Sequence, residues 1–281
     1  MIVVTGATGN VGRPLVQALA AAGEHVTAVA RGSADPAAPE GPRHRRADLT
    51  DPESLRPILD GADALFLHDG GASAQLLNPR DIVDVAKAGG VGRIVLLSSI
   101  GVATRPRSAS HGGTMRAIED AVRQSGLAWT ILRPGAFNSN AYAWVETVRV
   151  RRTVAAPFGD VGLPTVDPAD IAEVAAAALH RDGHAGRVYE PTGPARTTPR
   201  QRAEAIAGAL GEPIRFVEHS RDEARAQMLH FMPGPIVETT LDALGEPTPA
   251  ERRISPDVEL VLGRAPATFA DWVQRNIAAF R

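Results

Sequence analysis

Cysteine is absent from this chain of 281 residues. Its absence excludes a disulfide framework and any metal site built from thiolates. No apolar run approaches the length that a membrane-spanning helix needs. The net charge is −2 and no basic run is present, which argues against a nucleic-acid partner. Because the first apolar segment begins at Ile2, we expect no signal peptide and a cytoplasmic protein.

The composition that is present suits a protein with a substantial core. Apolar residues make up 44% of the chain and charged residues 22%, as in ordinary soluble globular proteins. The length suits one large α/β domain, or such a domain with a smaller additional lobe. Composition therefore bounds the fold class but says nothing about the chemistry.

Three regularly spaced glycines, Gly6, Gly9 and Gly12, open the chain. The apolar run before them, residues 2–4, is too short for a helix and predicts a strand. The residues after them carry a helical apolar stripe that stops at Gly23. A strand, a glycine turn and a helix present backbone N–H groups and a helix N-terminus to a diphosphate. The pattern predicts a nucleotide-binding site, the alternative being a turn that binds nothing.

The second predicted strand, residues 25–30, ends at Arg31, which follows Gly12 by 19 residues. At this place a carboxylate suits the ribose 2′-hydroxyl of NAD, and a basic side chain suits the 2′-phosphate of NADP. The first carboxylate after the strand is Asp35. A guanidinium offers phosphate oxygens a planar fork. We therefore predict NADP(H) as the cofactor, the alternative for Arg31 being a solvated loop position.

Strands and helices alternate regularly over the first 135 residues, which predicts an α/β fold with a doubly wound parallel sheet and right-handed crossovers. A third short strand is predicted to end at residues 48–49, and further strands are predicted at 62–67, 93–97 and 129–132. In such a sheet the carboxyl ends of the strands face the ligand. We therefore expect His68, Ser98 and Ser99 to lie near the site.

Beyond residue 135 the alternation loosens. We predict an NADP-binding Rossmann core over residues 1–193, within which 136–165 is irregular and lines the cleft. A smaller α+β substrate-binding lobe is predicted over 194–281. Asp167 and Asp170 are interpreted as helix-cap residues rather than catalytic carboxylates. The scattered histidines show no spacing typical of a metal site.

Several blocks of the sequence together resemble the NmrA-like family of atypical short-chain dehydrogenases/reductases. Besides the strand ending in Arg31, they are Thr5–Gly12, Gly92–Ser99, Ser125–Gly135 and Val166–Val174. The resemblance implies a Rossmann core that binds NADP(H), and similarity to NADPH-dependent quinone reductases. The cofactor contacts that it implies are Gly6, Thr8, Gly9, Asn10, Val11, Gly12, Arg31, Asp48, Leu49, His68, Ser98 and Pro134.

The chain differs from the wider superfamily in the residues that would act as the catalytic acid. Reductases there use Tyr-x-x-x-Lys, in which the lysine lowers the tyrosine pKa so that the phenol can donate a proton. Those two positions fall on His111 and Met115. Lys87 is the only lysine, and neither tyrosine, Tyr142 or Tyr189, has a lysine four residues later. The usual acid is therefore absent.

Three functions remain open, because a fold does not fix a function. In the first, a reductase transfers hydride directly to a quinone, enone or similar carbonyl compound, with a proton from His111, Ser99 or water. In the second, the protein is a non-catalytic NADP(H)-binding sensor or regulator. In the third, the fold is reused for a cyclisation, dehydration or isomerisation. We favour the reductase. His111 has a suitable intrinsic pKa, although it also reads as an ordinary polar loop residue.

The substrate is expected to be a small molecule that is flat and apolar, bound by a monomer or homodimer. Methionine and aromatic side chains after residue 135 suit such a ligand, although at helical spacing they are also typical of core. The residues predicted to bind the substrate are Asn138, Tyr142, Trp144, His230 and Phe231.

Overall fold

A computed structural model describes residues 1–32, 41–68, 75–108 and 112–281. The chain forms two compact units. The first contains residues 1–102, 111–134 and 168–190, and the second contains 103–110, 135–167 and 191–281. Each unit therefore collects segments that are far apart in the sequence.

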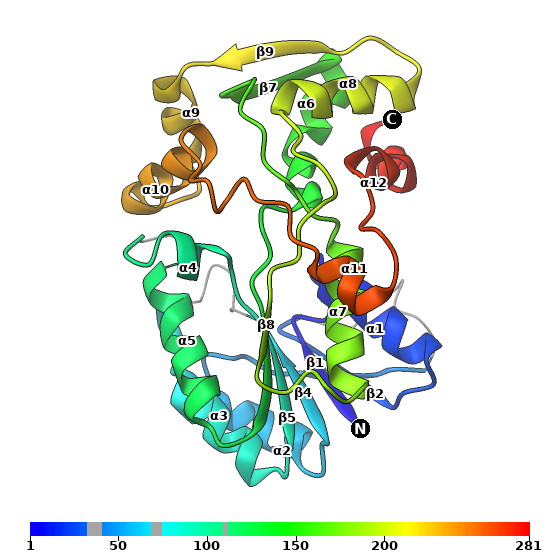
Figure 1. The fold of residues 1–281 in the computed structure, drawn as a ribbon, viewed down its shortest axis with the longest axis vertical. Coiled ribbons are helices and arrows are strands. Elements are labelled where there is room, and N and C mark those ends of the chain that lie inside the picture. Colours follow the sequence, from blue (N-terminus) through cyan, green and yellow to red (C-terminus); the bar gives the residue numbers. More distant parts are fainter. Residues whose placement is uncertain (33–40, 69–74, 109–111) are drawn as a thin grey trace. The chain divides into compact units, whose positions relative to one another are not determined.

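In the described part of the first unit, seven strands form one parallel sheet in the order β3-β2-β1-β4-β5-β6-β8 (Figure 1). The strands are β1 (Ile2–Thr5), β2 (Val26–Ala30), β3 (Arg43–Arg46), β4 (Ala64–Leu67), β5 (Arg93–Leu97), β6 (Ala128–Leu132) and β8 (Arg187–Tyr189). The order from β3 to β6 is that of doubly wound dinucleotide-binding sheets. The predicted Rossmann core is confirmed.

Helices cover both faces of this sheet. α1 (Gly12–Ala21) packs with α7 (Pro168–His180), while α3 (Pro79–Ala88) packs with α5 (Gly112–Gln124), and Figure 1 shows the two pairs on opposite sides. Leu15 and Leu19 of α1 are completely buried, and each burial contributes about 1.5–3 kcal/mol. The shorter elements are η1 (Pro52–Leu55), α2 (Arg56–Leu59) and α4 (Gly101–Thr104).

In the second unit, β7 (Thr153–Pro157) and β9 (Arg215–His219) form a parallel pair. Its described helices are η3 (Asn138–Trp144), α6 (Val145–Arg151), α8 (Pro199–Leu210), α9 (Arg221–Met228), α10 (Gly234–Gly245), α11 (Asp257–Leu262), α12 (Phe269–Asn276) and η4 (Ile277–Phe280). The core of this unit is built around Val148, Ile206, Trp272 and Phe280, which are buried. Among the residues that the structure describes, no helix is long and apolar enough to cross a membrane.

The division of the chain differs from the single boundary that we expected at residue 193. Residues 135–167 group with 191–281, because β7 pairs with β9 and because Leu163 bridges to Thr197. The stretch 136–165, expected to be irregular, contains η3, α6 and β7. These elements are too short to give a clear periodicity.

Candidate dinucleotide-binding site

The turn between β1 and α1 is shaped by its glycines. Gly6 has a φ of +63°, a left-handed conformation that glycine adopts at no steric cost. The N–H of Gly9 donates to the carbonyl oxygen of Gly6 at 2.9 Å. A β-carbon on Gly12 would lie 2.1 Å from that same oxygen. Because Thr8 and Asn10 are exposed, the outer face of this tight turn is open to a ligand.

Helix α1 starts directly after the turn. Its N-cap residue, Val11, has no polar side-chain atom with which to serve the amides of the first turn. The N–H of Arg13 donates to the carbonyl oxygen of Gly9 at 3.0 Å and Pro14 has no N–H, so Gly12 supplies the first-turn amide that has no acceptor within its own helix. A phosphate group at the helix N-terminus accepts from this amide and interacts favourably with the helix dipole.

A pocket of about 240 Å³ lies beside this turn. It is formed by the carboxyl ends of β1, β2 and β4 and by the segments after β3 and before α3, so it occupies the ligand side of the parallel sheet. The residues that line it are Thr5, Gly6, Thr8, Gly9, Val29, Ala30, Arg31, Ala47, Asp48, Leu49, Leu55, His68 and Leu77.

A second hollow, of about 300 Å³, is lined by two arginines, Arg31 and Arg46, together with Ala47, Asp48 and Ser54. Parallel pairing of β2 with β3 sets Ala30 opposite Arg46, so both guanidinium groups come from the same edge of the sheet. Both side chains are exposed. Two cations at the end of β2 suit the 2′-phosphate of a dinucleotide. Arg46 was not among the predicted contacts.

Asp48 lies in both hollows beside the arginines. Its Oδ1 accepts hydrogen bonds from the N–H and the hydroxyl of Thr50, each at 2.9 Å. These two hydrogen bonds lower the pKa of Asp48, and the positive charge of Arg31 lowers it further by a smaller amount. The carboxylate is therefore ionised, and Thr50 holds it in place.

His68 forms a wall of the first pocket at the end of β4. The hydroxyl of Thr5 donates to the carbonyl oxygen of Phe66 at 2.9 Å and lies 3.2 Å from Nδ1 of His68. A β-carbon on Gly6 would lie 2.7 Å from Cδ2 of the imidazole. The ring therefore packs directly against the glycine turn, and Gly6 leaves the space that it needs.

Some of the predicted cofactor contacts do not line the pocket: Asn10, Val11 and Gly12 belong to the turn and the start of α1, whereas Ser98 and Pro134 follow β5 and β6. The buried hydroxyl of Ser98 donates to Oε1 of Glu119 at 2.6 Å, so it points toward α5.

The chain just beyond these residues is used for backbone hydrogen bonds. The Ser99 hydroxyl accepts from the N–H of Gly101 at 3.2 Å, and the Pro134 carbonyl accepts from the N–H of Ile100 at 3.1 Å. The segments that follow β5 and β6 are therefore tied to each other.

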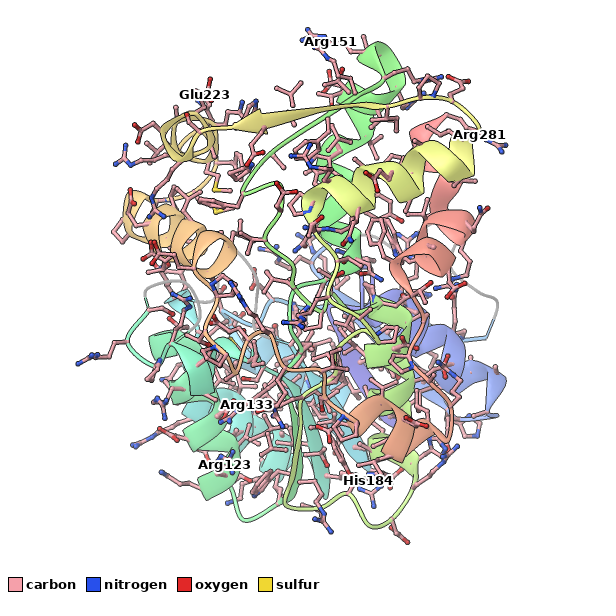
Figure 2. All side chains as sticks on the ribbon, turned by 45° about the horizontal axis from the view of Figure 1, so that its top comes forward. Arg123, Arg133, Arg151, His184, Glu223 and Arg281 are labelled. Carbon is pink, nitrogen blue, oxygen red and sulfur yellow. The ribbon has the colours of Figure 1, made fainter. Side chains whose placement is uncertain are left out.

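Glu119 is the centre of a buried ionic cluster at the ends of β5 and β6. Its side chain is 2% exposed and accepts two hydrogen bonds from Arg133, at 2.8 and 2.6 Å. Arg123, labelled with Arg133 in Figure 2, lies 3.5 Å from the same carboxylate. Burial alone would raise the pKa of Glu119, but the hydrogen bonds from Arg133 and Ser98 outweigh it, and the net shift is downward.

The residues predicted to bind the substrate lie in the second unit. The hydroxyl of Tyr142 donates to Oδ1 of Asn276 at 2.6 Å, and its ring meets that of Trp272 edge-on at 5.0 Å. Asn138 is completely buried, whereas Phe231 is 70% exposed. Trp144 packs against the core of this unit, and His230 is exposed in the turn after α9. The predicted proton donor His111 lies outside the described residues.

The glycine turn, the open helix N-terminus and the adjoining pocket define a dinucleotide-binding Rossmann protein. The chain belongs to the NAD(P)H-binding family, whose sequence profile matches residues 6–182. The predicted family and the predicted nicotinamide cofactor are thereby confirmed.

Relatives resemble the chain over its whole length. The (4-alkanoyl-5-oxo-2,5-dihydrofuran-3-yl)methyl phosphate reductase of Streptomyces griseus is 35% identical over 283 residues, which cover 100% of this chain and 99% of that protein. The NAD(P)H azoreductase of Xenophilus azovorans is 30% identical over 289 residues, with coverage of 100% and 99%. The Escherichia coli quinone oxidoreductase QOR2, solved with NADPH, has a TM-score of 0.79 and 25% identity, with coverage of 98% and 99%.

Proposed function

We propose that this protein is an NADPH-dependent reductase that transfers hydride to a small conjugated carbonyl compound such as a quinone or enone. The observation that carries the proposal is the pocket beside the glycine turn together with the second hollow, which Arg31 and Arg46 line. Full-length similarity to reductases supports the general class. The conjugated 5-oxo-2,5-dihydrofuran named in the Streptomyces relative supports an enone-like acceptor.

Different residues of the chain bind different parts of the cofactor. The amides of the glycine turn and of α1 bind the diphosphate, and Arg31 with Arg46 binds the 2′-phosphate. The Glu119–Arg133 pair fixes the ends of β5 and β6 on the same side of the sheet. NADPH, when bound there, supplies the hydride from its nicotinamide ring.

Proton delivery does not use the superfamily's tyrosine and lysine. Met115, at the lysine position, is buried in the core of the first unit, and Lys87 is exposed on α3. Tyr142 is hydrogen-bonded to Asn276, and the hydroxyl of Tyr189 lies 2.8 Å from Nδ1 of His184. A conjugated acceptor is already activated, so we propose that His111, Ser99 or water supplies the proton.

We propose that the substrate is bound by side chains of the second unit, chiefly Asn138, Tyr142, Trp144, His230 and Phe231. An exposed phenyl ring such as that of Phe231 suits a flat apolar ligand. Asn138 offers an amide without a protein partner in the described part of the chain. Phe231 would provide an apolar face for the substrate, and Asn138 would provide a polar anchor.

Cofactor preference tests the role of the two arginines. Arg31→Ala and Arg46→Ala are each expected to weaken NADPH binding about 10-fold or more, because each removes a charge-assisted hydrogen bond worth about 1.5–3 kcal/mol. NADH, which lacks the 2′-phosphate, should bind each variant as it binds the wild type. Fluorescence titration measures both affinities. The control is Arg43→Ala, an exposed arginine on the same strand that lines neither hollow. Equal wild-type affinity for NADH and NADPH would contradict the assignment.

Turnover tests the reductase proposal itself. With a panel of quinones, azo dyes and enones, including a butenolide phosphate ester, the absorbance of NADPH is expected to fall with at least one compound. Tight NADPH binding without consumption by any member would favour a sensor. Conversion of a compound without NADPH consumption would favour non-redox chemistry.

His111 can be tested in the same assay. If it is the proton donor, His111→Ala is expected to lower the turnover rate by about 10²–10⁴ while NADPH affinity is unchanged. An unchanged rate would assign the proton to Ser99 or water. Ser99→Ala, measured in parallel, separates those two.

A further inference from the structure

Arg202, near the start of α8, is a buried cation that forms no ion pair with any residue the structure describes. The residue is 8% exposed, and its Nε has no hydrogen-bond partner in the part of the chain that the structure describes. Its neighbour Arg200 shows the contrast, since it pairs with Asp160 and Glu218 at 3.0 and 3.1 Å. Burying a charge without a partner is costly, so such a group is retained where something else compensates it.

The protein itself compensates only part of this cost. The guanidinium carbon of Arg202 lies 5.4 Å from the centre of the Trp144 ring, a cation–π contact. Ile206, one turn later on the same face of α8, is completely buried in the core of the second unit. Burial lowers the pKa of Arg202 to about 10, so the side chain is still positively charged at neutral pH.

Neutral polar groups without partners in the described part of the chain lie at the start of η3, the 3₁₀ helix that ends at Trp144. Within the described residues, both side-chain polar atoms of Asn138 and the hydroxyl of Ser139 are buried and have no hydrogen-bond partner. The three-residue repeat of a 3₁₀ helix places Asn138, Ala141 and Trp144 on one face of η3. Ala141 of η3 and Ile206 of α8 belong to the same core.

Contacts made by the segments around Val166 and Thr197 also connect the start of η3 to the start of α8. The N–H of Asn138 donates to the carbonyl oxygen of Val166 at 2.8 Å. The hydroxyls of Thr165 and Thr197 lie 3.3 Å apart, and Thr197 precedes α8 by only two residues. The unpartnered cation and the unpartnered neutral groups thus belong to one region of the second unit.

We propose that Arg202, together with Asn138 and Ser139, binds a small oxyanion: a phosphate ester or a carboxylate. The guanidinium supplies the charge and a planar pair of donors, which match the oxygens of either group. The amide of Asn138 and the hydroxyl of Ser139 supply further donors. The site lies wholly within the second unit and shares Asn138 with the substrate site proposed above, so it rests on that part of the proposed function, while ion binding tests it without turnover.

Calorimetric titration of NADPH-saturated protein tests the site, because bound NADPH occupies the phosphate-binding turn of the first unit. Inorganic phosphate and benzoate are titrated separately, and saturable binding of one ion per chain is expected for at least one of them. Which ion binds distinguishes a phosphate ester from a carboxylate as the natural group. Arg202→Met is expected to weaken this binding at least 10-fold, and Arg202→Lys to weaken it less. Arg200→Met, on the same helix, should bind as the wild type does.

Thermal unfolding gives a second readout without turnover. The bound ion should raise the melting temperature of the wild type and of Arg200→Met, but not that of Arg202→Met. In a buffer of non-binding ions, Arg202→Met should melt at or above the wild-type temperature, because it removes an uncompensated buried charge. The proposal is overturned if neither ion binds, if Arg202→Met binds as tightly as the wild type, or if that variant melts well below the wild type in the ion-free buffer.

Discussion

Gly12→Ala is expected to raise the dissociation constant of NADPH at least about 100-fold. The new methyl group would lie 2.1 Å from the carbonyl oxygen of Gly6 and 2.9 Å from Cα of Ala7. Both are backbone atoms, so the whole turn has to open rather than one side chain moving aside. An opened turn misaligns the amides that face the diphosphate, and losing two hydrogen bonds to a charged group costs about 3–6 kcal/mol.

The measurement is a fluorescence titration with NADPH, accompanied by urea unfolding. Overpacking at Gly12 is expected to cost about 1–3 kcal/mol of stability, so the variant should remain folded. The control is Gly208→Ala on α8, where a β-carbon meets nothing within 4 Å. That helical substitution should stabilise the protein by about 0.5–1 kcal/mol and leave NADPH affinity unchanged. An affinity of Gly12→Ala within a few-fold of the wild type would show that the turn does not hold the diphosphate.

Glu119→Leu is expected to destabilise the protein by about 3–5 kcal/mol, because it leaves the partly buried guanidinium of Arg133 without its counter-ion. Adding Arg133→Met should recover most of this loss, since the pair is then replaced by apolar groups. Urea unfolding of the wild type, both single variants and the double variant measures the coupling. Asp120→Leu, at an exposed position on the same helix, is the control and should change stability by only about 0.5 kcal/mol. Additive effects of the two substitutions would mean that the pair is not coupled.

The same cluster predicts a dependence of stability on pH. The folded-state pKa of Glu119 is lower than its ordinary value of 4.5. A carboxyl group with a lowered pKa stabilises the folded state fully above its unfolded pKa and loses this contribution as the pH falls through its folded pKa. The wild type should therefore lose more stability below about pH 4.5 than the Glu119→Leu/Arg133→Met variant. Parallel losses in the two proteins would place the acid sensitivity elsewhere.

The parts of the fold that depend on local sequence are predictable, and the glycine turn is the clearest of them. The spacing of Gly6, Gly9 and Gly12 specifies a backbone conformation that a β-carbon would prevent, and the structure shows that conformation. The alternation of strands and helices likewise fixes the doubly wound sheet. In both patterns, the residues that determine the local structure are close together in the sequence.

Arg46 and Ser98 show where local sequence is insufficient. Arg46 joins Arg31 only because β3 pairs beside β2, which sets Ala30 opposite Arg46. Knowledge of the strand order would have identified it, since neighbouring parallel strands end at the same edge of a sheet. Ser98 lies at a strand end as expected, but its hydroxyl points to Glu119, which is 21 residues later in the chain.

The second unit is the part that sequence patterns predicted least. Its grouping depends on β7 pairing with β9, strands that lie about 60 residues apart. The aromatic side chains after residue 135 were expected to line a pocket, and Tyr142 packs on Trp272 and Phe280 at the edge of a core while it stays partly exposed. Aromatic residues at helical spacing suit both roles, and only the long-range packing separates them.

The central claim is that this protein moves hydride from NADPH to a conjugated acceptor. It is tested most directly by a single-turnover stopped-flow measurement of NADPH absorbance with the best acceptor from the panel. NADPH is deuterated at C4 of the nicotinamide ring on one face or on the other. The account predicts slower oxidation when the label is on one face and an unchanged rate when it is on the other. Equal rates for both labelled forms, or no oxidation by any acceptor, would contradict it.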